Sequence, residues 1–287
     1  MINNSERHGV RIGRFNTLQV LRFVDFGCYL DGGVDGEILM PAKYMAPGLK
    51  EGDDVRVFVY FDSEDRLVAT TEKPLAEVGQ VAYLTCKEVT SPGAFLDWGL
   101  VKDLLVPRRE QYDTMVAGRS YIVYVFQDKK TGRIAATQWF SRYLDNVMPQ
   151  YRVGDAAKAI VTSLSPLGYN VVIDNTFSAL IYNNDVFSPL KVGDRLTVYV
   201  TKVREDDKID VSPQPVGYAK VDSVAEKIIE RLKLSNGELN VGDKTNPELI
   251  RDLFGCSKKS FKMTIGTLYR EGVIEITDRG IKLKNLA

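Results

Sequence analysis

A short apolar stretch that contains a glycine occurs three times along the chain, and this repeat constrains the fold more than any other feature. The copies are centred on Gly27, Gly93 and Gly168. In each copy another glycine lies 14 positions before the central one, a leucine lies 12 positions after it, and a further glycine follows 13 positions later. Four landmarks in register across three copies indicate repetition of one structural unit.

Each repeat is predicted to form five short strands. The first copy predicts strands at 17–24, 28–30, 37–40, 55–61 and 66–70. Alternation in the fourth strand places Val55, Val57, Val59 and Phe61 inward, with Arg56, Phe58 and Tyr60 outward. The matching inward residues of the later copies are Tyr121, Val123, Val125, Leu196, Val198 and Val200. Five short strands with Gly-Asp turns predict a small closed β-barrel of the OB type.

The pattern changes after Lys220, where helical signals replace the strand repeat. Ser223 to Glu226 is a capping box before a helix that ends near Leu232. Asn246 and Pro247 start a second helix through Phe254, and Ser257 caps a third over 258–271. A hairpin with its turn at 277–280 follows. Three helices followed by a hairpin is the order of elements in a winged helix. The fold class is therefore mainly β with an α+β C-terminal domain, and the predicted domains are 1–74, 75–148, 149–217 and 218–287.

Composition argues against an enzyme and against a metal or cofactor site. His8 is the only histidine and precedes the first repeat, so histidine-based catalysis and metal binding lose their usual group. Cys28, Cys86 and Cys256 form no C-x-x-C pair. The chain carries 38 basic and 38 acidic residues, and it shows neither a signal peptide nor a membrane-length apolar run. We expect a cytoplasmic protein without cofactors, and no membrane partner.

Aromatic residues near the repeated glycines are candidates for stacking on nucleic-acid bases. A bulge at Gly27 would bring Phe26 and Tyr29 to one side of the sheet. The second and third repeats offer the pairs Phe95 with Trp98 and Tyr169 with Tyr182. The second and third strands of an OB barrel are a common nucleic-acid surface. The alternative is that one aromatic of each pair fills the core.

Basic residues of the third C-terminal helix are candidates for contacting phosphate. At 100° per residue, Lys259, Lys262 and Arg270 surround Gly266 on one face, and Lys258 flanks them. The opposite face carries Phe261, Ile265 and Leu268. A solvated lysine face is the alternative interpretation. Weaker phosphate candidates elsewhere are Arg108, Arg109, Lys202 and Arg204.

These motifs resemble a known domain family, the S1 RNA-binding domain, whose second strand carries a Phe-Gly-x-Phe type motif matched by residues 26–29. The whole chain resembles the conserved virulence factor B (CvfB/YitL) family, most specifically at 93–107 and 261–269. The resemblance implies three S1-type barrels, a winged helix, and a bacterial cytoplasmic RNA-binding protein that regulates gene expression. The chain departs from the S1 pattern in two places. In strand three, many S1 domains have a histidine where this sequence has Pro41, Pro107 and Tyr182. In strand two of the later copies, Pro92 and Leu167 replace an aromatic residue.

Our leading hypothesis is a non-catalytic, monomeric protein that prefers single-stranded RNA and binds it through barrels two and three and the winged helix. Residues 9–77 contain eight basic and twelve acidic side chains, so we expect the first barrel to be mainly structural. Two alternatives stay open. The winged helix could serve a DNA-binding transcription regulator, or the barrels could serve a protein-interaction adaptor at the ribosome or at an RNA-processing complex.

Overall fold

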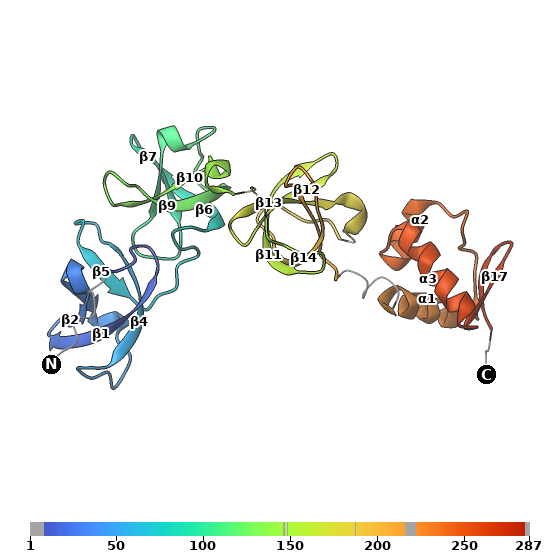
Figure 1. The fold of residues 1–287 in the computed structure, drawn as a ribbon, viewed down its shortest axis with the longest axis horizontal. Helices are drawn as coiled ribbons and strands as arrows, with labels where there is room; N and C mark the ends of the chain where they lie inside the picture. The colour runs from blue at the N-terminus through green and yellow to red at the C-terminus, as the bar shows by residue number, and fades with distance from the viewer. Residues whose placement is uncertain (1–8, 146, 148, 187, 216–221, 285–287) are drawn as a thin grey trace. The chain divides into compact units, whose positions relative to one another are not determined.

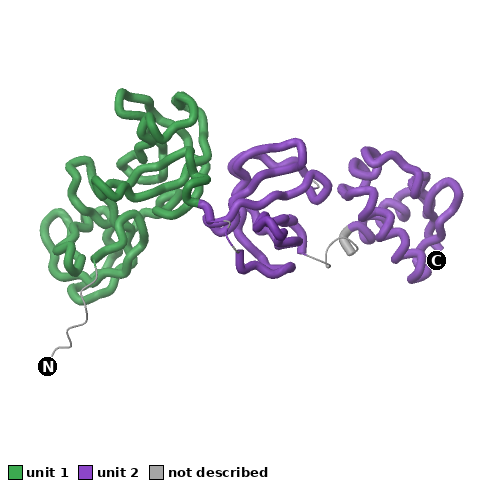
Figure 2. The backbone as a smooth tube through the Cα atoms, turned by 45° about the horizontal axis from the view of Figure 1, so that its top comes forward, with its two compact units in different colours: residues 1–143 green, residues 144–287 purple. Residues whose placement is uncertain are grey.

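The computed structural model describes residues 9–145, 147, 149–186, 188–215 and 222–284, with only the backbone of 222 and 223. His8 lies outside these residues. The chain forms two compact units, 1–143 and 144–287 (Figure 2). Two β-structures make up the first unit, and a third barrel and a helical domain make up the second (Figure 1). The domain limits given above remain predictions.

The first barrel contains the five strands that the alternation predicts, with bounds that differ by at most two residues. They are β1 (Phe15–Val24), β2 (Gly27–Asp31), β3 (Glu37–Pro41), β4 (Asp54–Phe61) and β5 (Leu67–Thr70). The strands close in the order β1-β2-β3-β5-β4, with β3 parallel to β5. Small and branched residues fill the interior, among them Cys28, Val57 and Val59.

The second and third repeats have the same strand order. The second contains β6 (Val81–Val89), β7 (Gly93–Asp97), β8 (Leu104–Pro107), β9 (Ser120–Gln127) and β10 (Ile134–Thr137). In this repeat β8 and β10 are the two edge strands of the sheet. They contact each other, but the sheet is not closed by strand pairing as it is in the other two repeats. The third contains β11 (Ala156–Ser165), β12 (Gly168–Ile173), β13 (Phe177–Tyr182), β14 (Arg195–Val203) and β15 (Ile209–Ser212), and it is closed.

The central glycine of each repeat is required because two strands approach closely there. A Cβ placed on Gly27, Gly93 or Gly168 would lie 2.2, 2.2 or 2.0 Å from a carbonyl oxygen of the following strand. Those carbonyls belong to Met40, Val106 and Ile181. Any larger residue would push the second and third strands of the barrel apart, so the repeated glycine is a backbone requirement.

The outer face of β4 differs from its predicted exposure. Phe58 and Tyr60 do point away from the first barrel, but both are buried in the core of the second. The Phe58 ring meets the Trp98 indole edge-on, with centroids 5.8 Å apart. Alternation identifies the two faces of a strand, but it cannot show that a neighbouring domain covers the outer one. The first two barrels therefore share a hydrophobic interface.

The C-terminal domain has the predicted order of helices and hairpin. Its elements are α1 (Asp222–Leu234), β16 (Glu238–Leu239), α2 (Pro247–Phe254), α3 (Lys258–Arg270), β17 (Ile274–Thr277) and β18 (Gly280–Leu283). The Asn246 and Ser257 side chains accept the predicted capping bonds from Glu248 N and Ser260 N. Helix α1 begins one residue before Ser223, whose side chain lies outside the description. The short strand β16 was not predicted, and it makes the wing a three-stranded sheet.

Within the described part of the chain, no helix has the length and apolar character needed to cross a membrane. The same residues contain no group of three or more histidine, cysteine, aspartate or glutamate side chains that could hold a metal ion. All three cysteines are buried, and none of them forms a disulfide bond within the described residues. Burial raises the pKa of the Cys28 and Cys86 thiols, which disfavours the reactive thiolate.

Candidate nucleic-acid interface

The second strand of each barrel presents one outward residue two positions after its glycine. In the first two barrels this residue is aromatic, Tyr29 and Phe95, and each lies between two fully buried neighbours. In the third barrel the same position is Asn170, which is exposed. Tyr169 falls at the inward position and packs against the core. The predicted use of Tyr169 for stacking is corrected, because it sits on the opposite face from Phe95.

In the first barrel, a cationic side chain lies over the ring of Tyr29, one of the two candidate stacking residues. The Arg22 guanidinium lies 4.2 Å from the centroid of the Tyr29 ring and also pairs with Glu37 at 2.6 Å. The hydrogen bond from Arg22 holds the pKa of Glu37 below its ordinary value. Phe26 is 58% exposed in the turn before β2. The predicted bulge at Gly27 is wrong, because the register shift between β1 and β2 lies in β1, between Val20 and Arg22.

Trp98 is the main correction in the second barrel. Its indole is only 2% exposed, and its Nε1 donates a hydrogen bond to the Lys102 carbonyl at 2.5 Å. The buried ring joins the interface with Phe58 of the first barrel. Although Trp98 is among the residues that line the cleft described next, too little of its indole is exposed for a base to stack on it, so Trp98 supports the interface between the barrels and is removed from the stacking set.

Phe95 lines a cleft of about 480 Å³ within the first unit. One wall is the β4–β5 hairpin, which contributes Tyr60, Phe61, Ser63 and Asp65. The remaining lining comes from the second barrel and is partly apolar, including Pro92, Leu105 and Pro107. The outward aromatic of the second barrel is thus half enclosed, whereas a lone sheet face would leave it open.

The two arginines after β8 have different surroundings. Arg108 donates to the carbonyls of Ser91 and Thr90, at 2.7 and 3.1 Å, and so holds the turn before β7. The side chain of Arg109 is 75% exposed and lies 3.6 Å from Asp128, which lines the cleft. Arg109 is therefore the better placed of the two to meet a phosphate at the rim of the cleft.

In the third barrel, Tyr182 is tied to a charge pair. Tyr182 faces Gly168 across the β12–β13 ladder, the place that Pro41 and Pro107 occupy in the other repeats. The Arg204 guanidinium donates to the Tyr182 hydroxyl and pairs with buried Asp210 at 2.6 Å. The hydrogen bond to Asp210 raises the pKa of Arg204, and the Asp210 carboxylate offsets the positive charge of the guanidinium. Arg204 positions Tyr182, and exposed Lys202 is the freer cation of these two.

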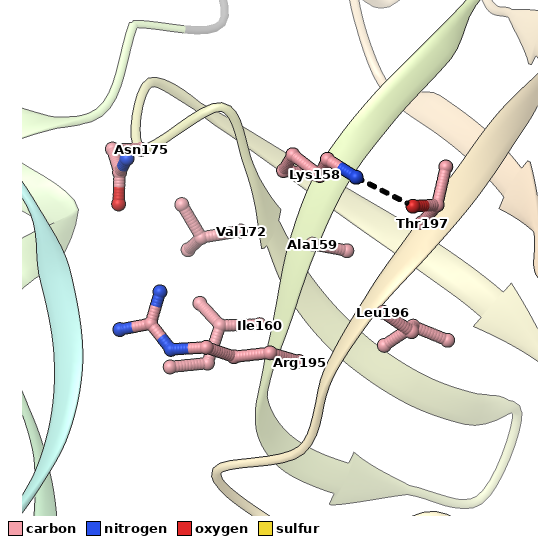
Figure 3. Close-up of a pocket in the computed structure, with 8 residues that line it drawn as sticks. All are labelled: Lys158, Ala159, Ile160, Val172, Asn175, Arg195, Leu196 and Thr197. Atoms are coloured by element: carbon pink, nitrogen blue, oxygen red, sulfur yellow. Dashed lines mark hydrogen bonds between the residues drawn. The ribbon is translucent and has the colours of Figure 1, made fainter.

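The structure has another concave surface, on the third barrel, that was not predicted from the sequence. This pocket of about 370 Å³ lies over β11 and β14, and its lining contains two cations and no carboxylate. Figure 3 shows Arg195 and Asn175 at one end of it and a 2.9 Å hydrogen bond from Lys158 to Thr197 at the other. Single basic residues on separate strands gave no sequence signal for it.

Helix α3 has the two faces that its periodicity predicts. Phe261, Ile265 and Leu268 are buried, while Lys259, Lys262 and Arg270 are exposed, and Lys258 is partly buried. Open space surrounds Gly266 where a Cβ would stand. Two features were missed. Asp243, from the loop before α2, pairs with Lys262 at 2.8 Å, and Met263 and Tyr269 add exposed apolar area beside the cations.

Comparison with known proteins identifies the domains. The S1 domain family matches residues 12–72 and 78–138, and the CvfB-like winged helix domain family matches residues 226–283. These are families of nucleic-acid-binding domains. A solved structure from Streptococcus pneumoniae, described as a multidomain protein with nucleic acid binding domains, matches with a TM-score of 0.41 and 24% identity, covering 95% of this chain and 98% of that one.

Full-length relatives agree with the domain matches. YitL of Bacillus subtilis is 26% identical over 283 residues, which cover 94% of this chain and 93% of YitL. Conserved virulence factor B of Staphylococcus saprophyticus is 23% identical over 242 residues, covering 82% of this chain and 81% of that protein. With S1 domains at its N-terminal end and a CvfB-like winged helix at its C-terminal end, the chain belongs to the conserved virulence factor B and YitL family.

Proposed function

We propose that this protein binds single-stranded RNA without catalysing a reaction on it, and that it regulates gene expression after transcription in the cytoplasm as a monomer. Its domain families bind nucleic acids and are not known as catalytic ones. The preference for RNA, the single-stranded form and the regulatory role are the parts of this proposal that go beyond the domain matches.

The observation that carries the proposal is the outward position of Phe95 on the second strand of its barrel. Exposed aromatics on this face stack on bases, each contributing roughly 1–3 kcal/mol with little choice among sequences. Stacking needs an unpaired base, because both faces of a base in a duplex are already covered. Tyr29 occupies the same position in the first barrel, and Tyr182 lies on the neighbouring strand of the third.

Helix α3 would supply contacts to phosphate. Its exposed cations surround a glycine that lets a backbone approach closely, and phosphate contacts dominate the affinity of most nucleic-acid-binding proteins. The helix has neither asparagine nor glutamine, and its single arginine lies at its end, so it offers few groups for reading base edges in a DNA groove. The proposed phosphate contacts are Lys258, Lys259, Lys262, Arg270, Arg109 and Lys202.

A titration of labelled single-stranded RNA against duplex DNA of the same length, repeated at several salt concentrations, tests the proposal. We expect tighter binding of the RNA, with an affinity that falls as salt rises. Phe95→Ala should weaken RNA binding by roughly 5- to 150-fold, the equivalent of one stacking contact. Lys259→Glu combined with Lys262→Glu should weaken it at low salt most strongly.

Duplex DNA bound as tightly as RNA would favour a DNA-binding regulator instead. Absence of binding to either nucleic acid would favour a protein-interaction adaptor and would overturn the proposal. Retention of full RNA affinity by both the Phe95 and the lysine variants would show that RNA binds elsewhere on the chain.

A further inference from the structure

The cleft beside Phe95 exists because the first barrel covers one side of the proposed stacking face of the second barrel. Lys102 Nζ donates to the Asp62 carbonyl at 2.5 Å and lies 3.9 Å from the Asp65 carboxylate. Arg133 of the β9–β10 hairpin also pairs with Asp65. These contacts connect the β4–β5 hairpin of one barrel to two separate segments of the other, so the wall is held on both sides.

The hairpin that forms this wall is itself ordered. The Asp62 carboxylate accepts hydrogen bonds from the backbone N–H groups of Glu64 and Arg66 and from the Arg66 guanidinium. Beneath it, Phe58 and Tyr60 are packed into the core shared with the second barrel. Ligand sites that are formed before binding lose less entropy when they are filled. The cleft is therefore a built feature of the first unit.

The charges around the cleft indicate which part of a nucleotide fits inside it. Its lining contains three carboxylates, Asp65, Asp103 and Asp128, and two cations, Lys102 and Arg133. Lys87 pairs with Asp103 at 2.8 Å, so these groups are already engaged with protein charges. An excess of carboxylates disfavours a phosphate in the interior, whereas a neutral ring can lie against Phe95 and the prolines without needing a counter-charge.

The rim, in contrast, suits the backbone of the same strand. Arg109 reaches Asp128 at the edge of the cleft while remaining mostly exposed. Lys129 and Lys130 come directly after Asp128 in the sequence and are exposed as well. The volume of about 480 Å³ is within the usual range of small-ligand pockets, roughly 300–1,000 Å³. Protein lies on two sides, so a base can enter only if it is unpaired and turned out of its stack.

We propose that the cleft between the first two barrels, lined by Phe95 and walled by the β4–β5 hairpin, holds one unpaired nucleobase of the bound RNA strand. This inference rests on the proposed function. It assigns to the first barrel a part in the binding site, where the sequence predicted a mainly structural role. It also gives a physical reason for single-strand selectivity, since a paired base cannot enter.

Filling the cleft from its wall tests the inference in the full chain. Ser63 is exposed and lines the cleft, whereas the neighbouring Glu64 is exposed on the same hairpin and does not line it. Ser63→Trp should lower the affinity for a labelled 12-nucleotide RNA by about fivefold or more, the loss of one stacked base. Glu64→Trp is the matched control; it removes a negative charge, so it should leave the affinity unchanged or slightly higher.

A crosslinking arm reports the position of the base directly. RNA that carries a single 4-thiouridine should crosslink to a peptide containing Phe95 or Phe61 in the wild-type protein, and this crosslink should be lost in Ser63→Trp. Thr131→Trp fills the cleft from the β9–β10 hairpin and should reproduce the loss, which guards against a Ser63→Trp variant that fails to fold. Circular dichroism and thermal melting establish folding of each variant.

The outcomes separate this inference from the proposed function. Normal RNA affinity in both filling variants, together with weakened binding by Phe95→Ala, would place RNA on an open sheet face and would overturn the cleft while leaving RNA binding intact. Normal affinity in all three variants would overturn the cleft and place the RNA site elsewhere. Failure of the wild-type protein to bind RNA would overturn both proposals.

Discussion

Phe58 and Trp98 meet edge-to-face, with their ring planes at 79° and their centroids 5.8 Å apart, and this contact joins two barrels that the sequence presents as separate repeats. Neither ring belongs to the interior of the first barrel, since both lie in the hydrophobic core of the second. Aromatic pairs of this geometry add about 0.5–1.5 kcal/mol to the effect of burial alone. The first unit therefore behaves as one folded body.

Phe58→Ala should lower the stability of the first unit by about 3–5 kcal/mol, because it removes a fully buried aromatic from the shared core. The only two tryptophans of the chain, Trp98 and Trp139, both lie in this unit, so their fluorescence during urea unfolding reports on it selectively. Phe26→Ala is the control in the same barrel. Its ring is mostly exposed, and we expect a change within about 0.5 kcal/mol. Equal effects of the two changes would contradict a joint core.

Gly93→Ala should destabilise the second barrel by more than the usual cost of a surface substitution. The added methyl would lie 2.2 Å from the Val106 carbonyl oxygen, so β7 and β8 must separate. We expect a loss of about 1–3 kcal/mol, typical of overpacking, in the same fluorescence-monitored unfolding. A variant as stable as the wild type would show that the close approach of these strands is not what requires glycine.

Apart from the short strand β16, the strands and helices were predictable from sequence because each depends on local pattern. Alternation predicted the inward residues of β9 and β14 and three of the four in β4, whereas Phe61, also predicted inward, is not part of the first barrel's core and lines the cleft. Capping residues such as Asn246 predicted the start of α2. The burial of Trp98 was not predictable in this way, because it depends on a surface of another repeat. The pairing of Asp243 with Lys262 has the same origin, since the two residues are far apart in sequence and meet only in the folded domain.

One error did have a signal in the sequence. Tyr169 follows its glycine by one position, whereas Tyr29 and Phe95 follow theirs by two, and a strand reverses the direction of its side chains at each residue. Counting from the glycine, and not only noting an aromatic near it, places Tyr169 on the inward face. The cleft beside Phe95 had no such signal, because its wall comes from a hairpin of the preceding repeat.

Asp62→Asn should make the first unit less stable at neutral pH and less sensitive to acid. Burial opposes ionisation of Asp62, but the hydrogen bonds from Arg66 and Glu64 outweigh it and hold the pKa of the carboxyl below its ordinary value of 3.8. The stabilisation from the charged form is therefore complete above about pH 4 and is lost as pH falls through the lower pKa of the folded state.

We expect Asp62→Asn to cost about 1 kcal/mol at pH 7, the net contribution of hydrogen bonds of this kind, and the difference from wild type to shrink at pH 3. Urea unfolding monitored by tryptophan fluorescence at the two pH values measures it. Glu64→Gln serves as the control, because its exposed pair with Arg66 contributes little. A difference that grows toward low pH would have the wrong sign for a lowered pKa.

Asp243→Asn should strengthen RNA binding by removing the carboxylate that pairs with Lys262. Each additional free cation can contact one more phosphate, so we expect an affinity about twofold or more higher at low salt and a steeper fall as salt rises. Glu238→Gln controls for the general loss of a negative charge, since Glu238 pairs with Lys282 in the wing sheet. Fluorescence anisotropy over a salt series measures both quantities. Equal gains from both variants would indicate a long-range charge effect and would argue against a specific role for Lys262.

Gly266→Ala should change stability and RNA binding in opposite directions. The glycine lies inside α3 with open space at the Cβ position, so alanine should stabilise the helix by about 1 kcal/mol through its higher helix propensity. The same methyl projects from the centre of the basic face, where it would hold a phosphate away from the helix backbone and lower RNA affinity by about twofold or more. Circular dichroism at 222 nm follows the stability, because the α-helices of the described chain all lie in this domain, and anisotropy follows the binding. A stabilised variant with unchanged affinity would show that no phosphate approaches α3 at Gly266, and that its cations act from the ends of their side chains alone.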